Sequence, residues 1–322
     1  MESIQSTFLG EIKKKIPSHL SLADELAELL NISRDSAYRR IRGETVLSLD
    51  EVKRICTHYH VSLDTLLNPT PEMVCFHNRR IDSKYFTFEM WLKSILHNVE
   101  MLSGFADKTL YYAAKDIPLF QYYKFPKLAA FKMFFWTKTY HQYPSLADSK
   151  FSFDLVPKEI IQVGEKLWNQ YAQIPSVEIW SDETATVTLR QIEYYLETAV
   201  VTQAQALEIC DEYSRMLEHI RACAQNGSKN GESNYSLYKN DILIAETTIF
   251  FKMGTKRVAF LTYNTMNVLT TSNDSFCSII DDYLSNVINK SIQISASGER
   301  ERSKFFNRMQ ESIQLLKKKI LT

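Results

Sequence analysis

Four arginines within ten residues are the most chemically informative feature of this 322-residue chain. They are Arg34, Arg39, Arg40 and Arg42, and a single acidic residue, Asp35, lies among them. An arginine guanidinium can donate two parallel hydrogen bonds to the edge of a guanine. Its charge also displaces counterions from phosphates. The run therefore carries chemistry that suits contact with a nucleic acid.

The spacing of the apolar residues in this run predicts a helix. Ala37 and Ile41 lie four residues apart and form its inward stripe. Ser33 is the expected N-cap, and Gly43 stands where a helix end favours a left-handed residue. The candidate DNA-contacting residues on this helix, 33–42, are Ser33, Arg34, Asp35, Ser36, Tyr38, Arg39, Arg40 and Arg42. A solvated charged face on a small helical bundle is the alternative interpretation.

The helix would belong to a unit of five short helices within residues 1–68. Ser48 and Glu51 have the spacing of a capping box at the start of a fourth helix. The last short helix would end the unit with Leu66 and Leu67, and a proline-containing linker follows at 69–84. The second and third helices, joined by a tight turn, have the arrangement that major-groove reading requires.

Four segments carry a family resemblance. They are Ser21–Ala27 (SLADELA), Asn31–Ser33, the SAYRRIRG run from Ser36 to Gly43, and Val61–Leu67. With the order of the predicted helices, they resemble Cro/phage-repressor-like (XRE-type) helix-turn-helix domains over residues 8–68. The resemblance implies a cytoplasmic transcription regulator that binds double-stranded DNA as a homodimer, with the helix at 33–42 in the major groove.

Two positions depart from the family pattern. Ala23 stands where many members have a glutamine that contacts phosphate, and Ile41 stands where many have an acidic residue. We therefore expect the arginines to make more of the phosphate contacts.

Charge and composition exclude several classes of fold and several kinds of binding site. The 38 basic and 38 acidic residues of the chain cancel. Residues 1–68 contain nine basic and ten acidic residues, whereas 33–42 contain four arginines and one aspartate, so the positive charge is concentrated on this helix. Eight glycines and eight prolines are too few for a glycine-fingerprint nucleotide fold or a loop-rich all-β chain. Five cysteines without a CxxC pair indicate neither a disulfide framework nor a zinc site. We expect no cofactor, no metal and no membrane partner, because an apolar run of membrane-spanning length is also missing.

The predicted fold is mainly α, with a large α+β domain over 85–322. Helical periodicity predicts a helical segment over 85–225, with helices at 85–103, about 126–142, 157–172, 184–199 and 203–224, interrupted by a β-favouring stretch at Thr109–Ala114. Residues rich in Ile, Thr, Phe and Val around Gly254 predict a β-hairpin region at about 235–271. Helices resume over 274–320. The sheet is therefore expected to be small and antiparallel.

Aromatic residues of this second domain form a candidate ligand pocket. Tyr111 and Tyr112 lie in a β-favouring stretch, and Phe135 and Trp136 end an unusually aromatic helix. Such side chains can line a pocket for a small-molecule or peptide effector. Core packing is the alternative at each position.

These observations favour a DNA-binding transcription regulator that acts without catalysis. Residues 85–322 would provide dimerisation, and their size favours an additional ligand-sensing role. None of the common catalytic motifs occurs in the sequence, although an enzyme with a fused DNA-binding head is the alternative. A helix-turn-helix protein that scaffolds other proteins without binding DNA is a third hypothesis.

Overall fold

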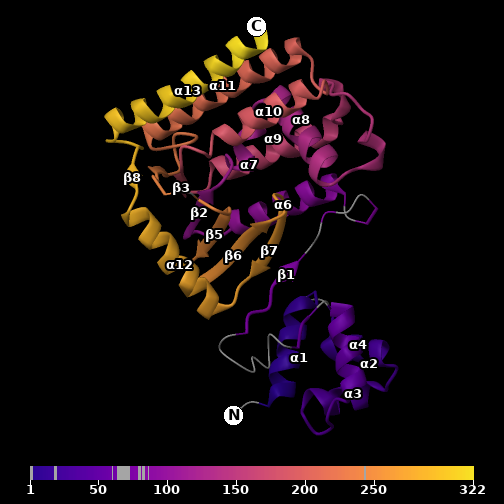
Figure 1. Ribbon diagram of the computed structural model, residues 1–322. Helices are drawn as coiled ribbons and strands as arrows, with labels where there is room; N and C mark the ends of the chain where they lie inside the picture. Colours follow the sequence, from indigo (N-terminus) through magenta and orange to yellow (C-terminus); the bar gives the residue numbers. More distant parts are fainter. Residues whose placement is uncertain are drawn as a thin grey trace. The chain divides into compact units, whose positions relative to one another are not determined.

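The computed structural model divides the chain into two compact units, Met1–Cys75 and Phe76–Thr322 (Figure 1). Each unit contains a hydrophobic core of its own. The boundary falls within the linker predicted at 69–84. The residues that the structure describes are 3–17, 20–59, 61–63, 73–78, 81, 84–85, 87–242 and 244–322.

Four helices are described in the first unit: α1 (Ile4–Lys15), α2 (Leu22–Leu30), α3 (Arg34–Ile41) and α4 (Leu49–Tyr59). Each contributes to one buried cluster, whose fully buried members include Phe8, Ile12, Leu26, Ala37 and Ile55. The predicted inward stripe of α3 is thus confirmed, since Ala37 is buried and Ile41 packs against the cluster. The predicted fifth helix, with Leu66 and Leu67, lies outside the described residues.

The helix ends follow the local sequence signals. Ser33 Oγ accepts a hydrogen bond from the Ser36 amide, which caps α3. Ser48 and Glu51 form the reciprocal bonds of a capping box at the start of α4. Gly43 has φ of +76°, the left-handed conformation that favours glycine after a helix end.

The second unit is built on one eight-stranded sheet in the order β1-β7-β6-β5-β2-β3-β4-β8. The strands are β1 (His77–Asn78), β2 (Lys108–Ala114), β3 (Ser176–Trp180), β4 (Tyr235–Lys239), β5 (Thr248–Met253), β6 (Lys256–Tyr263), β7 (Asn267–Thr271) and β8 (Ile292–Gln293). β2, β3 and β4 pair in parallel, and the other neighbours pair antiparallel.

The predicted small antiparallel sheet is therefore wrong, and the segment predicted as helical, 85–225, also contains strands, one of them at the β-favouring stretch around Tyr111. β2 and β3 lie inside that segment and form the parallel centre of a mixed sheet. A strand buried on both faces usually appears in the sequence as a continuous apolar run. β3 lacks such a run because it carries Ser176 and Glu178, so the sequence did not indicate it. The β5–β6 hairpin is confirmed, with Gly254 at φ +56° in its turn.

Eight α-helices are described in the second unit, and most lie close to their predicted ranges. They are α6 (Phe88–Ser103), α7 (Leu119–Tyr122), α8 (Pro126–Phe135), α9 (Lys158–Ala172), α10 (Thr186–Glu197), α11 (Gln203–Asn226), α12 (Asp274–Asn289) and α13 (Glu299–Leu321). The aromatic helix α8 passes into a π-helical turn at Trp136–Tyr140. Short 3₁₀ turns occupy Pro144–Leu146 and Phe153–Leu155.

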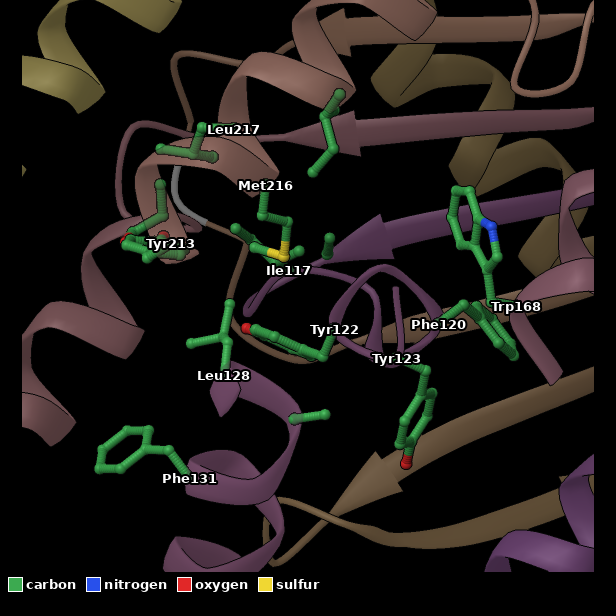
Figure 2. Close-up of a cluster of buried hydrophobic side chains, with 14 of the residues drawn as sticks. Ile117, Phe120, Tyr122, Tyr123, Leu128, Phe131, Trp168, Tyr213, Met216 and Leu217 are labelled. Carbon is green, nitrogen blue, oxygen red and sulfur yellow. The ribbon is translucent and has the colours of Figure 1, made fainter. Parts of the chain in front are cut away.

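Helices cover both faces of the sheet. Alternate β2 residues Leu110 and Tyr112 belong to the main core with α6–α11 and α13, whereas Ala113 packs in a second cluster with Cys277 and Leu284 of α12. Figure 1 shows α12 beside β6 and α11 beside α13. Figure 2 shows the main core, where side chains of α7, α8, α9 and α11 converge.

A polar cluster lies inside this core. The carboxylate of Glu178 on β3 accepts hydrogen bonds from Trp180 Nε1 at 2.9 Å and from the hydroxyls of Tyr235, at 3.0 Å, and Tyr171. Lys229 Nζ donates to the carbonyl oxygens of Tyr171 and Ile174, each at 2.8 Å. Burial raises the pKa of Glu178 and lowers the pKa of Lys229 to about 7.

Candidate nucleic-acid interface and ligand cavity

α3 presents a charged outer face while Ala37 is fully buried beneath it. The side chains of Arg34, Arg39 and Arg42 are 62%, 54% and 54% exposed. Tyr38, Ser33 and Asp35 are also exposed, and Ser36 is half-buried. Most of the residues predicted to contact DNA are therefore accessible on one short helix.

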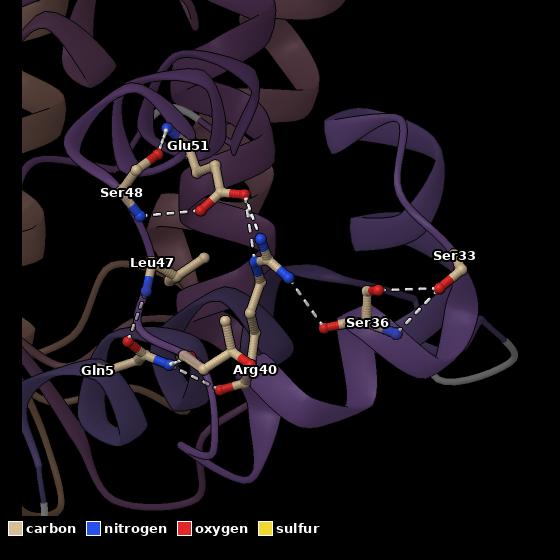
Figure 3. A network of polar contacts seen from close by, with 8 residues as sticks. Gln5, Ser33, Ser36, Arg40, Leu47, Ser48 and Glu51 are labelled. Carbon is tan, nitrogen blue, oxygen red and sulfur yellow. Dashed lines mark hydrogen bonds and ion pairs between the residues drawn. The ribbon is translucent and has the colours of Figure 1, made fainter.

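Arg40 is a correction to this prediction, because it does not face outward. Its side chain is only 15% exposed, and its Nη2 and Nε donate to Glu51 Oε1 at 2.8 and 3.1 Å (Figure 3). Nη1 donates to the Ser36 carbonyl oxygen at 3.2 Å. Arg40 thus joins α3 to the start of α4. The pattern of one helix could not show this, since Glu51 reaches Arg40 only through the folded turn.

The carboxylate of Glu51 accepts hydrogen bonds from the Arg40 side chain and from the Ser48 amide. Burial on its own would raise the pKa of its carboxyl. The hydrogen bonds from the Ser48 backbone and from Arg40 outweigh that effect and hold the pKa below its usual value. The ion pair therefore favours the charged form of Glu51.

The other arginines form exposed ion pairs. Arg34 Nε lies 2.8 Å from Asp24 Oδ1, and Arg42 Nε lies 2.6 Å from Glu44 Oε1. Arg39 also faces Glu44, at 3.7 Å. The hydrogen bond from Arg42 holds the pKa of Glu44 low. Exposed pairs of this kind contribute about 0–1 kcal/mol, so phosphates can replace the carboxylates at little cost.

Gln5 on α1 is a positioning residue that the sequence analysis missed. Its Nε2 donates to the carbonyl oxygens of Arg40 and Thr45, each at 2.8 Å, and its Oε1 accepts from the Leu47 amide at 2.9 Å (Figure 3). One side chain thus fixes the turn that follows α3. A lone glutamine in a short helix gives no sequence signal for this role.

The second unit contains a cavity of about 360 Å³ between α6 and the sheet. Its apolar walls include Trp91, Ile95, Val99, Ile249, Phe251 and Phe260. Its polar lining includes His77, His97, Asn98, Asp116 and Thr270. The volume is in the lower range of small-molecule sites.

Two of the four residues predicted to line a pocket do so. Tyr112 and Trp136 line this cavity, whereas Tyr111 and Phe135 do not. Tyr111 contacts Phe250 on the opposite face of the sheet, because neighbouring residues of a strand point to opposite faces. Phe135 is buried in the core. The structure therefore places Tyr112 and Trp136 in the wall of this cavity, and Tyr111 and Phe135 outside it.

α11 carries a histidine–cysteine pair of the kind that nucleophilic catalysis can use. His219 Nε2 and Cys223 Sγ lie 3.5 Å apart on α11. Burial raises the pKa of the Cys223 thiol to about 11 and lowers the pKa of His219 to about 4. Both groups are neutral at pH 7, so this pair does not generate a thiolate.

The first unit has the arrangement of a DNA-binding helix-turn-helix domain. Residues 13–66 match a protein-family model described as Helix-turn-helix. The match confirms the resemblance of this segment and supports a DNA-binding role for it. It covers a minor part of the chain and leaves the second unit outside.

The other comparisons found no relatives. No curated protein and no solved structure matches the chain. Within the described residues, no cluster of three or more His, Cys, Asp or Glu could hold a metal ion. In the same part of the chain, every helix is too short or too polar to cross a bilayer.

Proposed function

We propose that this protein is a sequence-specific transcription regulator that reads duplex DNA with residues 33–42 in the major groove. The observation that carries the proposal is the exposed arginine face of α3 on a domain that matches the helix-turn-helix family. A helix of this size fits the groove, and residues near its N-terminus reach the base edges.

The side chains divide into two roles in this proposal. Arg34, Arg39 and Arg42 leave their exposed carboxylate partners to contact bases or phosphates, together with Tyr38. Arg40 acts as a positioning residue, because its pair with Glu51 fixes α3 relative to α4. The acidic partners on the same surface oppose binding to phosphates that lie off the correct register.

The second unit would serve dimerisation and effector sensing. A homodimer places two α3 helices on half-sites that are related by two-fold symmetry. The cavity beneath α6 supports the sensing role. We propose that this unit acts by binding and not by catalysis.

Selection of bound fragments from random DNA with the full-length protein tests the DNA-binding proposal. The affinity for the selected site should fall steeply as salt rises. Arg39→Ala and Arg42→Ala should each weaken binding by about 5-fold to 100-fold, equivalent to about 1–3 kcal/mol. Lys304→Ala, which removes an exposed, ion-paired cation from the second unit, is the matched control and should bind normally. Equal affinity of both arginine variants and the control would contradict the assignment of the interface.

Sedimentation of the protein with and without the selected site tests dimerisation. Two protomers per site are expected, and the selected sequences should contain two related half-sites. A protein that stays monomeric at micromolar concentration in both conditions would overturn the proposal of a homodimer.

A further inference from the structure

The cavity in the second unit carries a fixed hydrogen-bond acceptor in an otherwise mostly apolar wall. Asp116 lies in this wall, and its side chain is 23% exposed. Of the lining side chains, it is the one carboxylate in the described part of the chain. A carboxylate in such surroundings favours a ligand group that donates a hydrogen bond.

Three hydrogen bonds from the protein hold the carboxylate of Asp116 in place. Oδ1 accepts from the Ile117 amide and the Tyr122 hydroxyl, each at 2.8 Å, and Oδ2 accepts from Lys132 Nζ at 2.7 Å. Lys132 is fully buried, and Gln191 accepts a further hydrogen bond from it at 2.8 Å. The acceptor is therefore rigid, and its charge is balanced inside the protein. Oδ2 keeps a second lone pair for a ligand.

The cavity also contacts the strand that follows the DNA-binding unit in the chain. His77 of β1 lines the cavity and pairs with Thr270 of β7, which lines it too. Among the described residues, His77 of β1 pairs with Thr270 and Asn78 pairs with Leu269 of β7. Beside these pairs, the Ile81 amide donates to Asn267 Oδ1 at 3.0 Å. β1 lies at the edge of the sheet, so contacts from a ligand would change the stability of its docking measurably.

We propose that this cavity binds a compact apolar molecule with one hydroxyl or amine, whose donor group bonds to Asp116, and that the bound molecule holds β1 on β7. The apolar walls stabilise the body of the ligand. A carboxylic acid of the same size binds less well, because its carboxylate would face Asp116. A ligand that contacts both His77 and Thr270 has higher affinity for the docked strand, so its binding shifts β1 toward docking.

Ligand binding is tested first without DNA. N-phenyl-1-naphthylamine is a suitable probe, since it is apolar, carries one N–H donor and fluoresces in apolar surroundings. Trp91 and Trp136 in the wall should lose fluorescence when the probe binds. In displacement assays with full-length protein, 1-decanol and 1-decylamine should act at concentrations at least about ten-fold lower than decanoate, a chain of equal length. Absence of probe binding, or equal displacement by decanoate, would overturn the ligand class.

A matched pair of α6 variants locates the binding site. Ser94 lines the cavity, and Ser94→Phe should reduce probe affinity at least about ten-fold by filling it. Met101 lies on the same helix, is exposed and stays outside the wall, so Met101→Phe should bind the probe normally. Unfolding curves of both variants show whether the fold is intact. Normal binding by folded Ser94→Phe would place the probe elsewhere and contradict the proposal.

Hydrogen exchange tests the effect on β1. The probe should slow amide exchange at residues 76–78 and 267–271 at least about five-fold in the wild type and not in Ser94→Phe. Unchanged exchange in the presence of bound probe would refute the coupling. The inference deepens the sensing role that the proposed function gives to the second unit, and it rests on the proposed function in that respect. Loss of probe binding with intact DNA binding therefore rejects this inference alone, whereas the reverse result rejects the DNA-binding proposal alone.

Discussion

Two neighbouring arginines of α3 have the same side-chain chemistry but different roles. Arg39 and Arg40 are adjacent in sequence, yet one is 54% exposed and the other 15% exposed. The sequence predicts the chemistry of a guanidinium at both positions. Only the packing of α3 against α4 decides which guanidinium is available to DNA.

This difference in exposure predicts that alanine at position 40 affects stability, whereas alanine at position 39 affects DNA binding. Arg40→Ala should lower the free energy of unfolding of the first unit by about 1–3 kcal/mol, because Glu51 would lose its partner while half-buried. Arg39→Ala should change that free energy by less than about 0.5 kcal/mol while weakening DNA binding. Urea unfolding followed by far-UV circular dichroism measures the first effect, and binding to the selected site measures the second. Similar losses of stability in both variants would show that Arg40 has no special structural role.

Lys229 predicts a pH dependence of stability in the second unit. Its pKa is about 7 in the folded protein and about 10.5 in the unfolded chain, because burial disfavours the charged amine. Between these values the unfolded state binds the additional proton, so the free energy of unfolding rises with pH. We expect a rise of about 2 kcal/mol between about pH 7 and pH 9, measured by urea unfolding with tryptophan fluorescence.

The variant Lys229→Met should lose this rise, even if its stability is lower throughout because three acceptors lose their donor. Lys304→Met, at an exposed position, should keep it. Parallel pH curves for the wild type and Lys229→Met would show that another group controls stability in this range.

At the scale of elements, local propensity and tertiary packing oppose each other at one glycine. Gly164 lies within α9, where alanine would favour the helix by about 1 kcal/mol. A Cβ atom at this position, however, would lie 2.3 Å from Cδ1 of Tyr123, a buried ring of the core shown in Figure 2. The close approach of α9 to Tyr123 therefore requires glycine.

Gly164→Ala should destabilise the second unit by about 1–3 kcal/mol in spite of its better helix propensity. Gly10→Ala on α1 is the matched substitution, because its Cβ would meet no atom within 4 Å. It should stabilise the first unit by up to about 1 kcal/mol. Tryptophan fluorescence during unfolding follows the first variant, and circular dichroism follows the second. A stabilising effect of Gly164→Ala would show that Tyr123 moves aside without cost.

The sheet shows the limit of element prediction from this sequence. Most helices and the β5–β6 hairpin follow from periodicity and turn residues. β3 does not, because Ser176 and Glu178 break its apolar run, and most of their hydrogen-bond partners lie outside the strand, namely Gln121, Tyr171, Lys229 and Tyr235. These partners come from other parts of the chain, so no local pattern reveals the strand.

At the scale of the whole molecule, the two units should unfold as separate cooperative transitions. All four tryptophans lie in the second unit, so their fluorescence reports on that unit alone. Leu26 is fully buried in the first core, and Leu26→Ala should lower the stability of the first unit by about 2–5 kcal/mol. The fluorescence midpoint should stay unchanged while the circular-dichroism signal of the first unit is lost at lower urea. A shift of both signals together would show that the units unfold as one.

The sequence by itself determined the helices of the first unit, their caps, the arginine chemistry of α3 and the family resemblance of that segment. These properties depend on residues close in sequence, where helical periodicity and capping act directly. The tertiary structure alone decided that Arg40 is an internal ion-pair partner and that Gln5 fixes the following turn. It also decided that Tyr112 lines a cavity while Tyr111 lies on the other face of the sheet. Each of these depends on contacts between distant residues, which are defined only when the chain is packed.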